Sequence, residues 1–190
     1  LKEVRMATDA NISPDGKMAA FVVWEWVPDR PKQRGRIWVV DTPGGEPRPL
    51  TKGPRGDSSP RWSPDSQQLA FISRGEGEKD KPQLHLIAAE GGEAKQVCKM
   101  PNGVSDLAWS PDGPSSSPGR YIAFLSVEGE EPKNDPRVFI PGQGRHRRLW
   151  RVRPESDTPE LVTPDGQSIW QYAWSPDGKQ FAVYFVSGPD

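Results

Sequence analysis

A four-residue turn motif recurs along this chain and constrains its fold more than any other feature. The motif Ser-Pro-Asp-Gly stands at Ser13–Gly16, Ser110–Gly113 and Ser175–Gly178, and a near copy, Ser-Pro-Asp-Ser, stands at Ser63–Ser66. In a type I turn, Ser suits the first position, Pro presets φ at the second, Asp is tolerated at the third, and Gly is favoured at the fourth. A short apolar run follows each copy, at Met18–Val23, Gln68–Ser73, Tyr121–Leu125 and Lys179–Phe185. A supersecondary unit copied at this spacing predicts a propeller or a solenoid.

Each repeat also holds a second pair of β-type runs, joined by another turn. These turns stand at Asp41–Glu46, Glu90–Glu93 and Pro154–Thr158. Two hairpins give four strands, which is the build of a propeller blade. We therefore predict an all-β chain that forms one partial β-propeller over 1–190. Its blade units are expected at 4–58, 59–105, 106–170 and 171–190.

The number of repeats predicts an incomplete ring. Three units are complete, and the fourth holds only its opening hairpin. Propellers close with about four to eight blades. We therefore expect about three and a half blades of a larger propeller, with open edges through which the chain would self-associate.

Composition narrows the classes of partner. The net charge is −1, from 25 basic and 26 acidic residues, so neither nucleic acid nor an anionic membrane is an expected partner. The longest apolar run, Met18–Trp24, is too short to span a bilayer. Cys98 is the one cysteine, which excludes an internal disulfide and fits a reducing, cytoplasmic location. We expect it to be a small core hydrophobe.

The sequence holds no recognisable motif for hydrolysis or for metal or phosphate binding. An α/β-type serine hydrolase needs Gly-x-Ser-x-Gly, whose small residues let a strained turn expose the serine oxygen. Four Gly-x-Ser triplets occur, but none has the second glycine two places further on. The triplets end at Ser58, Ser105, Ser115 and Ser168, and the residues at the glycine position are Pro60, Leu107, Ser117 and Trp170. Paired cysteines and a His-x-x-x-His pair are also missing. We predict no catalytic residue, no metal site and no cofactor in this chain.

Two histidines remain as candidates for chemistry. His85 alternates with Leu84 and Leu86, which indicates a plain strand residue on the opposite face from the leucines. His146 lies in the basic segment Gly144–Arg148. One interpretation places His146 in a solvated loop. The alternative is that His146 contacts substrate or a second domain.

The densest charge feature is a run of arginines. We name Arg145, Arg147, Arg148 and Arg151 as a candidate contact patch. One interpretation is a solvated strand face close to Glu155. The other is a patch that binds a carboxylate or a partner domain, because guanidinium groups bind carboxylates in a bidentate way.

Tryptophans divide into two groups. Trp62, Trp109 and Trp174 stand directly before the turn motif, so we interpret them as structural. Trp24 and Trp26 lie two apart on one strand face. They could form an exposed contact surface, but packing within the blades is the favoured interpretation.

Four stretches resemble a known family of proteins: Ile12–Phe21, Leu50–Ser73, Gln83–Glu93 and Gly103–Gly113. They resemble the N-terminal β-propeller of prolyl-oligopeptidase-type serine peptidases, in the acylaminoacyl-peptidase and dipeptidyl-aminopeptidase branch. TolB-type propellers share the repeated turn, whereas Leu50–Ser73 resembles the peptidase branch more narrowly. The resemblance implies a propeller that caps a separate α/β-hydrolase domain and screens peptides before they reach its Ser-Asp-His triad.

Three hypotheses for function follow. The first is a non-catalytic propeller segment that gates and selects peptide substrates for a hydrolase domain absent from this chain, with that domain and the peptides as partners. The second is a free-standing TolB-like propeller that acts as an interaction scaffold. The third is an enzyme such as a lyase in the central channel, which would require histidine, arginine and carboxylates to converge on the inner strands. Fold alone does not choose among them.

Overall fold

The computed structural model describes residues 6–25, 34–53, 56–75, 77, 79–111, 121–129 and 146–187. These residues form fourteen strands and no helix. The first sheet holds β1 (Met6–Ile12), β2 (Met18–Glu25), β3 (Arg34–Asp41) and β4 (Arg48–Pro49). The second holds β5 (Asp57–Trp62), β6 (Gln68–Arg74), β7 (Pro82–Ala88) and β8 (Lys95–Gln96). The third holds β9 (Ser105–Trp109), β10 (Ile122–Val127), β11 (Arg147–Val152) and β12 (Glu160–Leu161), and the fourth holds β13 (Gln167–Trp174) and β14 (Phe181–Ser187).

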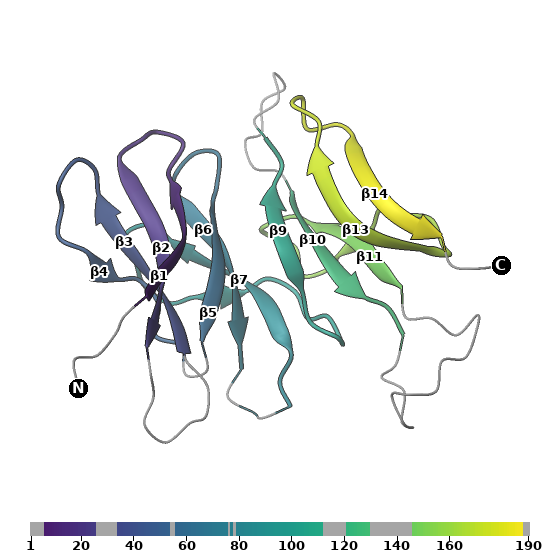
Figure 1. Ribbon diagram of the computed structural model, residues 1–190, viewed down its shortest axis with the longest axis horizontal. Helices are drawn as coiled ribbons and strands as arrows, with labels where there is room; N and C mark the ends of the chain where they lie inside the picture. The colour runs from purple at the N-terminus through teal and green to yellow at the C-terminus, as the bar shows by residue number, and fades with distance from the viewer. Residues whose placement is uncertain are drawn as a thin grey trace.

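The sheets are the blades of an incomplete β-propeller, and we number them blade 1 to blade 4. In every sheet the strands pair antiparallel in the order of the sequence. The sheets follow one another as a fan, with the N-terminal blade at one end and the C-terminal hairpin at the other (Figure 1). The first strands of successive blades lie together, β1 against β5 and β5 against β9. We call the first strand of each blade its inner strand. The predicted fold is confirmed, while the predicted limits of the blade units stay a prediction.

The repeated turn is held by its own side chains. In blade 1 the Ser13 hydroxyl donates to Asp15 Oδ1 at 2.6 Å and accepts the Met18 N–H at 3.0 Å. The same carboxylate oxygen accepts the Lys17 N–H at 3.1 Å. The equivalent set recurs in blades 2 and 4, around Ser63–Asp65 and Ser175–Asp177. Aspartate therefore ties the turn to the strand that follows, a role beyond the tolerance expected from the sequence.

The fourth residue of each described turn takes a left-handed backbone. The φ angle is 74° at Gly16, 62° at Ser66 and 67° at Gly178. Glycine adopts this region without steric cost, which explains its preference there. In blade 3 the hydroxyl of Ser110 accepts the Tyr121 N–H at 3.2 Å, and positions 112 and 113 of that turn lie outside the described residues.

Apolar layers between successive blades form the core. Blades 1 and 2 share a cluster that includes Ala20, Trp62 and Phe71. Blades 2 and 3 share one around Ala70 and Phe124, with Cys98 in it. The layer between blades 3 and 4 is made by Ala123, Leu125, Leu149 and Ile169, with Tyr172, Trp174, Phe181 and Val183 packed against it. Each blade is thus stabilised by its neighbours, as the stacking of repeats requires.

The three tryptophans that precede the turns also bond the preceding blade. The indole N–H of Trp62 donates to the Asn11 carbonyl at 3.3 Å, and that of Trp109 to the Arg61 carbonyl at 2.9 Å. Trp174 donates to the Ala108 carbonyl at 3.4 Å. Each acceptor lies two residues before the turn serine of the preceding blade. These side chains are structural and act across the joint between blades.

The turn aspartates predict an acid-sensitive stability. The hydrogen bond from Ser13 and the Lys17 backbone N–H lower the pKa of Asp15, and Ser175 and the Lys179 N–H lower that of Asp177. A folded-state pKa below the unfolded value gives stability that is present above the unfolded pKa, about 3.9, and is lost as pH falls through the folded pKa. In urea unfolding at pH 7 and pH 2.5, the Asp15→Asn/Asp177→Asn variant should lose less stability on acidification than the wild type. Equal losses would contradict this.

The indole bond predicts a measurable cost for Trp109→Phe. Phenylalanine keeps most of the apolar contact but removes the N–H that meets the Arg61 carbonyl. We expect a loss of about 1–2 kcal/mol in urea unfolding, from the bond and the smaller ring. Trp170→Phe is the matched control, because that side chain is 64% exposed, and should change stability by less than about 0.5 kcal/mol. Similar values for both variants would show that the indole bond contributes nothing.

Candidate functional site

The inner strands of blades 1 to 3 share a bulge that carries a small polar residue. Asp9, Ser59 and Asp106 have φ angles of 51°, 54° and 54°. Each lies four residues before its turn serine, where the pairing of the inner strand with its neighbour shifts register. Non-glycine residues in the left-handed region are uncommon, although Asp adopts it more readily than most. Bulges re-aim side chains and occur often beside functional sites.

Two ion pairs form around these bulges. Arg61 Nη1 lies 2.9 Å from Asp9 Oδ1, across the joint between blades 1 and 2. Arg147 Nη2 lies 2.6 Å from Asp106 Oδ2, within blade 3. The four side chains are between 34% and 55% exposed. Solvent screens such pairs, so they contribute little to stability and their charges remain accessible.

Tyr172 belongs to the same group. Its hydroxyl lies 2.5 Å from the Asp106 carbonyl oxygen and 2.9 Å from that of Ala123. Burial raises the pKa of Tyr172, the charge of Asp106 raises it further, and the charges of Arg61 and Arg147 lower it. The phenol therefore stays protonated and acts as a hydrogen-bond donor. We call Asp9, Arg61, Asp106, Arg147 and Tyr172 the inner-strand polar group.

An open hollow of about 500 Å³ adjoins this group at the end where the turns lie. The described residues that line it come from blades 1 to 3: Asn11, Ile12, Pro14, Arg61, Trp62, Pro64, Leu107, Ala108, Trp109, Ser110 and Pro111. Arg61 is the one ionisable residue in that lining. Proline and tryptophan rings beside a guanidinium suit an apolar group that carries, or lies next to, a negative charge or a carbonyl.

The candidate arginine patch is divided among three surroundings. Arg147 joins the inner-strand polar group. Arg148 is 2% exposed and lies 2.7 Å from Glu128 Oε2 and 3.1 Å from Asp165 Oδ1. Arg151 lies 2.8 Å from Glu160 and stacks 4.5 Å from the centre of the Tyr121 ring. Arg145 lies outside the described residues. Strand alternation places Arg148 on the opposite face of β11 from Arg147 and Arg151, and the contact role of these arginines stays a prediction.

Both histidines lie away from the hollow's lining. The His85 ring is half-buried and lies 5.6 Å from the ring of Phe71. It pairs with Phe71 in register, as Trp38 pairs with Phe21 in blade 1. His85 thus occupies an aromatic packing position, as expected of a plain strand residue. The backbone carbonyl of His146 accepts the Glu128 N–H at 2.8 Å, beside the start of β11.

Other residues singled out by the sequence are structural where they are described. Cys98 is buried in the layer between blades 2 and 3, and burial raises the pKa of its thiol to about 11. The indole of Trp24 donates to Thr8 Oγ1 at 2.8 Å, which fits packing within the blade. Trp26 lies outside the described residues. In the described part of the chain, no three potential metal-ligating side chains gather, and no helix has the length and apolarity to cross a membrane.

Sequence reasoning missed four members of the inner-strand polar group: Asp9, Arg61, Asp106 and Tyr172. A signal was available in the repeat itself. When the repeats are aligned on the turn serine, the residue four places earlier is Asp9, Ser59, Asp106 or Gln171, so that position is always polar in otherwise β-type strands. The pairing of Asp9 with Arg61 had no such signal, because it depends on how two blades stack.

Fold and site together define the chain as part of a β-propeller with polar, partly exposed inner strands. No family model matches it. Over 80 residues it is 43% identical to the uncharacterized peptidase YuxL of Bacillus subtilis (strain 168), a stretch that covers 42% of this chain and 12% of that protein.

Solved structures of lower identity share the fold. Acylaminoacyl peptidase from Pyrococcus horikoshii superposes with a TM-score of 0.64 at 16% identity, over 98% of this chain and 32% of that one. TolB from Acinetobacter baumannii superposes with a TM-score of 0.61 at 20% identity, over 94% of this chain and 37% of that one. An oligogalacturonate lyase in complex with manganese superposes with a TM-score of 0.67 at 18% identity, over 95% of this chain and 47% of that one. This chain therefore spans less than half the length of each of these proteins. The resemblance to peptidase and TolB-type propellers is confirmed, and identities at this level show the fold alone.

Arg148 provides a test of which residues support the fold. Arg148→Met removes the buried charge and leaves two carboxylates that already contact solvent, 47% and 97% exposed. We expect a cost of about 1–2 kcal/mol, from the lost bonds to Thr163. Glu128→Ala/Asp165→Ala should cost more, about 3 kcal/mol, because it leaves a buried cation without a counter-charge. Urea unfolding measures both, and the reverse order would contradict the assignment.

Proposed function

We propose that this chain is a non-catalytic propeller segment of a prolyl-oligopeptidase-type serine peptidase. It would gate and select peptide substrates for an α/β-hydrolase domain carried elsewhere in the same polypeptide. The observation that carries the proposal is the 43% identity over 80 residues to a protein named as a peptidase. The lack of a Gly-x-Ser-x-Gly elbow in the sequence fits a non-catalytic role for this segment.

The inner-strand polar group suits such a role. A peptide presents amide dipoles along its backbone and opposite charges at its two ends. Asp9–Arg61 and Asp106–Arg147 offer both signs of charge, three of them on inner strands and Arg147 on β11, and Arg61 also lines a hollow with Trp62 and proline rings. An extended peptide could therefore be held by its backbone while its apolar side chains contact the rings.

The joint between blades 1 and 2 suits control of access. The Asp9–Arg61 pair crosses this joint, so moving the two inner strands apart would break it. An ion pair with partly exposed members is worth about 0.2–1 kcal/mol, which is small enough to open and close readily. Selection by size would then follow from how far the inner strands separate.

A free-standing TolB-like scaffold is the second candidate. The fold likeness to TolB, at 20% identity, favours it. The third hypothesis, a channel enzyme such as a lyase, gains less support. Its chemistry would require a histidine within the inner-strand polar group, and neither described histidine belongs to it.

One experiment separates the two main candidates. The intact mass of the native polypeptide should be several times the 21.1 kDa of this chain, and that polypeptide should hydrolyse peptide anilides and be labelled by a fluorophosphonate at serine. The 190-residue chain should do neither, because no nucleophile elbow lies within it.

Two outcomes would overturn the proposal. A native mass near 21.1 kDa would favour the scaffold. Hydrolysis and serine labelling by the isolated chain would show that it is itself the enzyme.

A further inference from the structure

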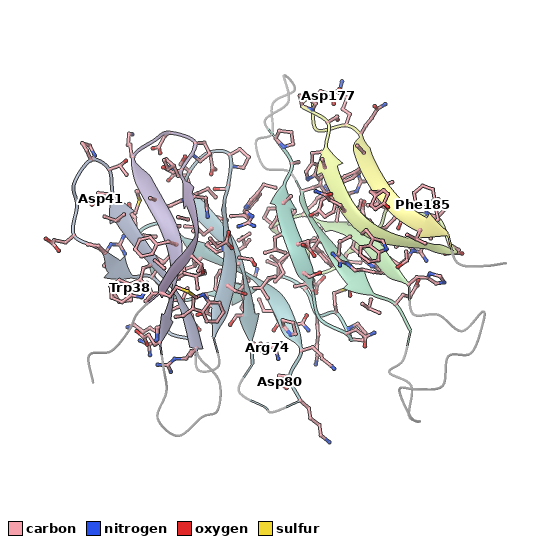
Figure 2. The ribbon with its side chains drawn as sticks, viewed as in Figure 1. Trp38, Asp41, Arg74, Asp80, Asp177 and Phe185 are labelled. Atoms are coloured by element: carbon pink, nitrogen blue, oxygen red, sulfur yellow. The ribbon has the colours of Figure 1, made fainter. Side chains whose placement is uncertain are left out.

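The connection between blades 2 and 3 holds Asn102 and Gly103 in a tight turn. The Gly103 N–H donates to the Met100 carbonyl at 3.1 Å and closes this turn, which lies beside the start of β7. Asp80, two residues before that strand, marks the same end of the blades, and Asp177 marks the opposite end, where the repeated turns lie (Figure 2). The connection therefore belongs to two complete blades and lies away from the hollow.

The structure requires glycine at position 103 for two independent reasons. Its φ angle is 80°, in the left-handed region that side chains disfavour. A Cβ at Gly103 would also lie 2.8 Å from both the Cδ atom and the carbonyl oxygen of Pro82. Any side chain there would be strained and would collide with β7.

The hydrogen bonds equally require an amide at position 102. The Asn102 Nδ2 donates to the Val127 carbonyl at 2.9 Å and to the Gly129 carbonyl at 2.6 Å. Both amide hydrogens are thus bonded, and they tie the connection to the end of β10 in blade 3. We call these two bonds the amide tie. An aspartate in this place would turn an oxygen without a hydrogen toward two carbonyl oxygens.

The fold thereby fixes a chemically labile dipeptide. Asparagine is among the thermolabile residues, and a following glycine leaves its own backbone nitrogen open to reaction because it has no Cβ. The Gly103 nitrogen can attack Asn102 Cγ, so that an N–Cγ bond forms and the Cγ–Nδ2 bond breaks. The proton of the attacking N–H leaves with Nδ2 as ammonia. One water then opens the resulting five-membered imide, which gives aspartate or isoaspartate at position 102.

The closed connection opposes this attack. The turn bond occupies the Gly103 N–H. The Gly103 carbonyl accepts the buried hydroxyl of Ser126 at 2.7 Å, and the next N–H, that of Val104, donates to the Pro82 carbonyl at 2.8 Å. The peptide between residues 102 and 103 must turn toward the side chain before the nitrogen can reach Cγ. That rotation breaks these bonds and the amide tie.

We propose that Asn102 is a deamidation site whose reaction is released by opening of the connection between blades 2 and 3. Each opening exposes the dipeptide, and the reaction turns a transient opening into a permanent loss of the amide tie. The carboxylate that replaces the amide faces the Val127 and Gly129 carbonyls, so the connection no longer closes as before. This inference does not depend on a peptidase function.

A comparison of reaction rates tests the proposal. The folded chain and a free peptide of residues 99–106 are incubated in the same mildly alkaline buffer. Peptide mapping by mass spectrometry follows the replacement of –NH₂ by –OH at Asn102, and enzymatic methylation detects isoaspartate. We expect a rate at least about tenfold lower in the folded chain, which corresponds to about 1.4 kcal/mol of local opening. Asn11, which Ile12 follows, is the internal control and should stay unchanged.

A matched pair of variants locates the restraint. Ser126→Ala removes the hydroxyl bond to the Gly103 carbonyl and should speed the reaction at Asn102 about two- to tenfold, the range for one net hydrogen bond. Ser168→Ala removes a hydroxyl that accepts the Arg147 N–H at 3.2 Å, between blades 3 and 4. It should leave the rate at Asn102 at the wild-type value.

Two further variants test the effect of the product. Asn102→Asp and Asn102→Ala both remove the amide tie, but only aspartate turns a carboxylate toward the two carbonyls. We expect the midpoint of urea unfolding to fall from wild type to Asn102→Ala, and further to Asn102→Asp.

Three results would overturn the proposal. Equal rates in the folded chain and the peptide would show that the connection does not restrain the dipeptide. A Ser126→Ala rate equal to that of the wild type or of Ser168→Ala would show that opening of this connection does not release the reaction. Equal midpoints for Asn102→Asp and Asn102→Ala would show that the carboxylate does not disturb the connection. Circular dichroism of each variant confirms that the strands are intact, so that global unfolding is not mistaken for local opening.

Discussion

Stacking of blades through apolar layers is the constraint on which the rest of this structure depends. A four-stranded sheet has two faces, and here residues on both faces of the central strands are buried, as Ala123 and Phe124 are in β10. Burial of one large apolar side chain is worth about 1.5–3 kcal/mol, compared with about 0.5–1.5 kcal/mol for a net hydrogen bond. The layers therefore supply most of the stabilisation. The indole bonds fix the register of one blade on the next, because they are directional and the apolar contacts are not.

The charges divide into structural and accessible sets for the same reason. Arg148 is 2% exposed and is held by Glu128, Asp165 and Thr163, so removal of its carboxylate partners would leave a buried cation. Arg61 and Arg147 pair with aspartates of the inner strands, and solvent reaches both guanidinium groups. Neighbouring arginines in one strand thus have different roles, set by strand alternation and not by the local density of charge in the sequence.

The sequence predicts the local structure well because turns and short strands depend on neighbouring residues. The Ser-Pro-Asp-Gly copies and the runs after them locate β2, β6, β10 and β14. The inner-strand polar group could not be predicted in the same way. Asp9 and Arg61 are 52 residues apart, and their contact follows from the rotation between two stacked blades. Strand alternation already predicts that Arg148 faces away from Arg147 and Arg151. The partners that separate Arg147 from Arg151, Asp106 and Glu160, lie on other strands and could not be read from the run of charges.

Within one repeat, some positions carry the fold and others are free to vary. The turn serine recurs in all four blades, and so does an alanine on the second strand: seven residues after the serine at Ala20, Ala70 and Ala182, and thirteen residues after it at Ala123. The position four residues before the serine does not: Asp9, Ser59 and Asp106 are left-handed, and Gln171 is not. A left-handed non-glycine residue costs about 1–3 kcal/mol and persists where the surrounding structure holds it. Three of the four blades thus tolerate strain at an inner-strand position that carries a polar side chain in every blade. A function that distinguishes this propeller from others of the same fold is best sought there.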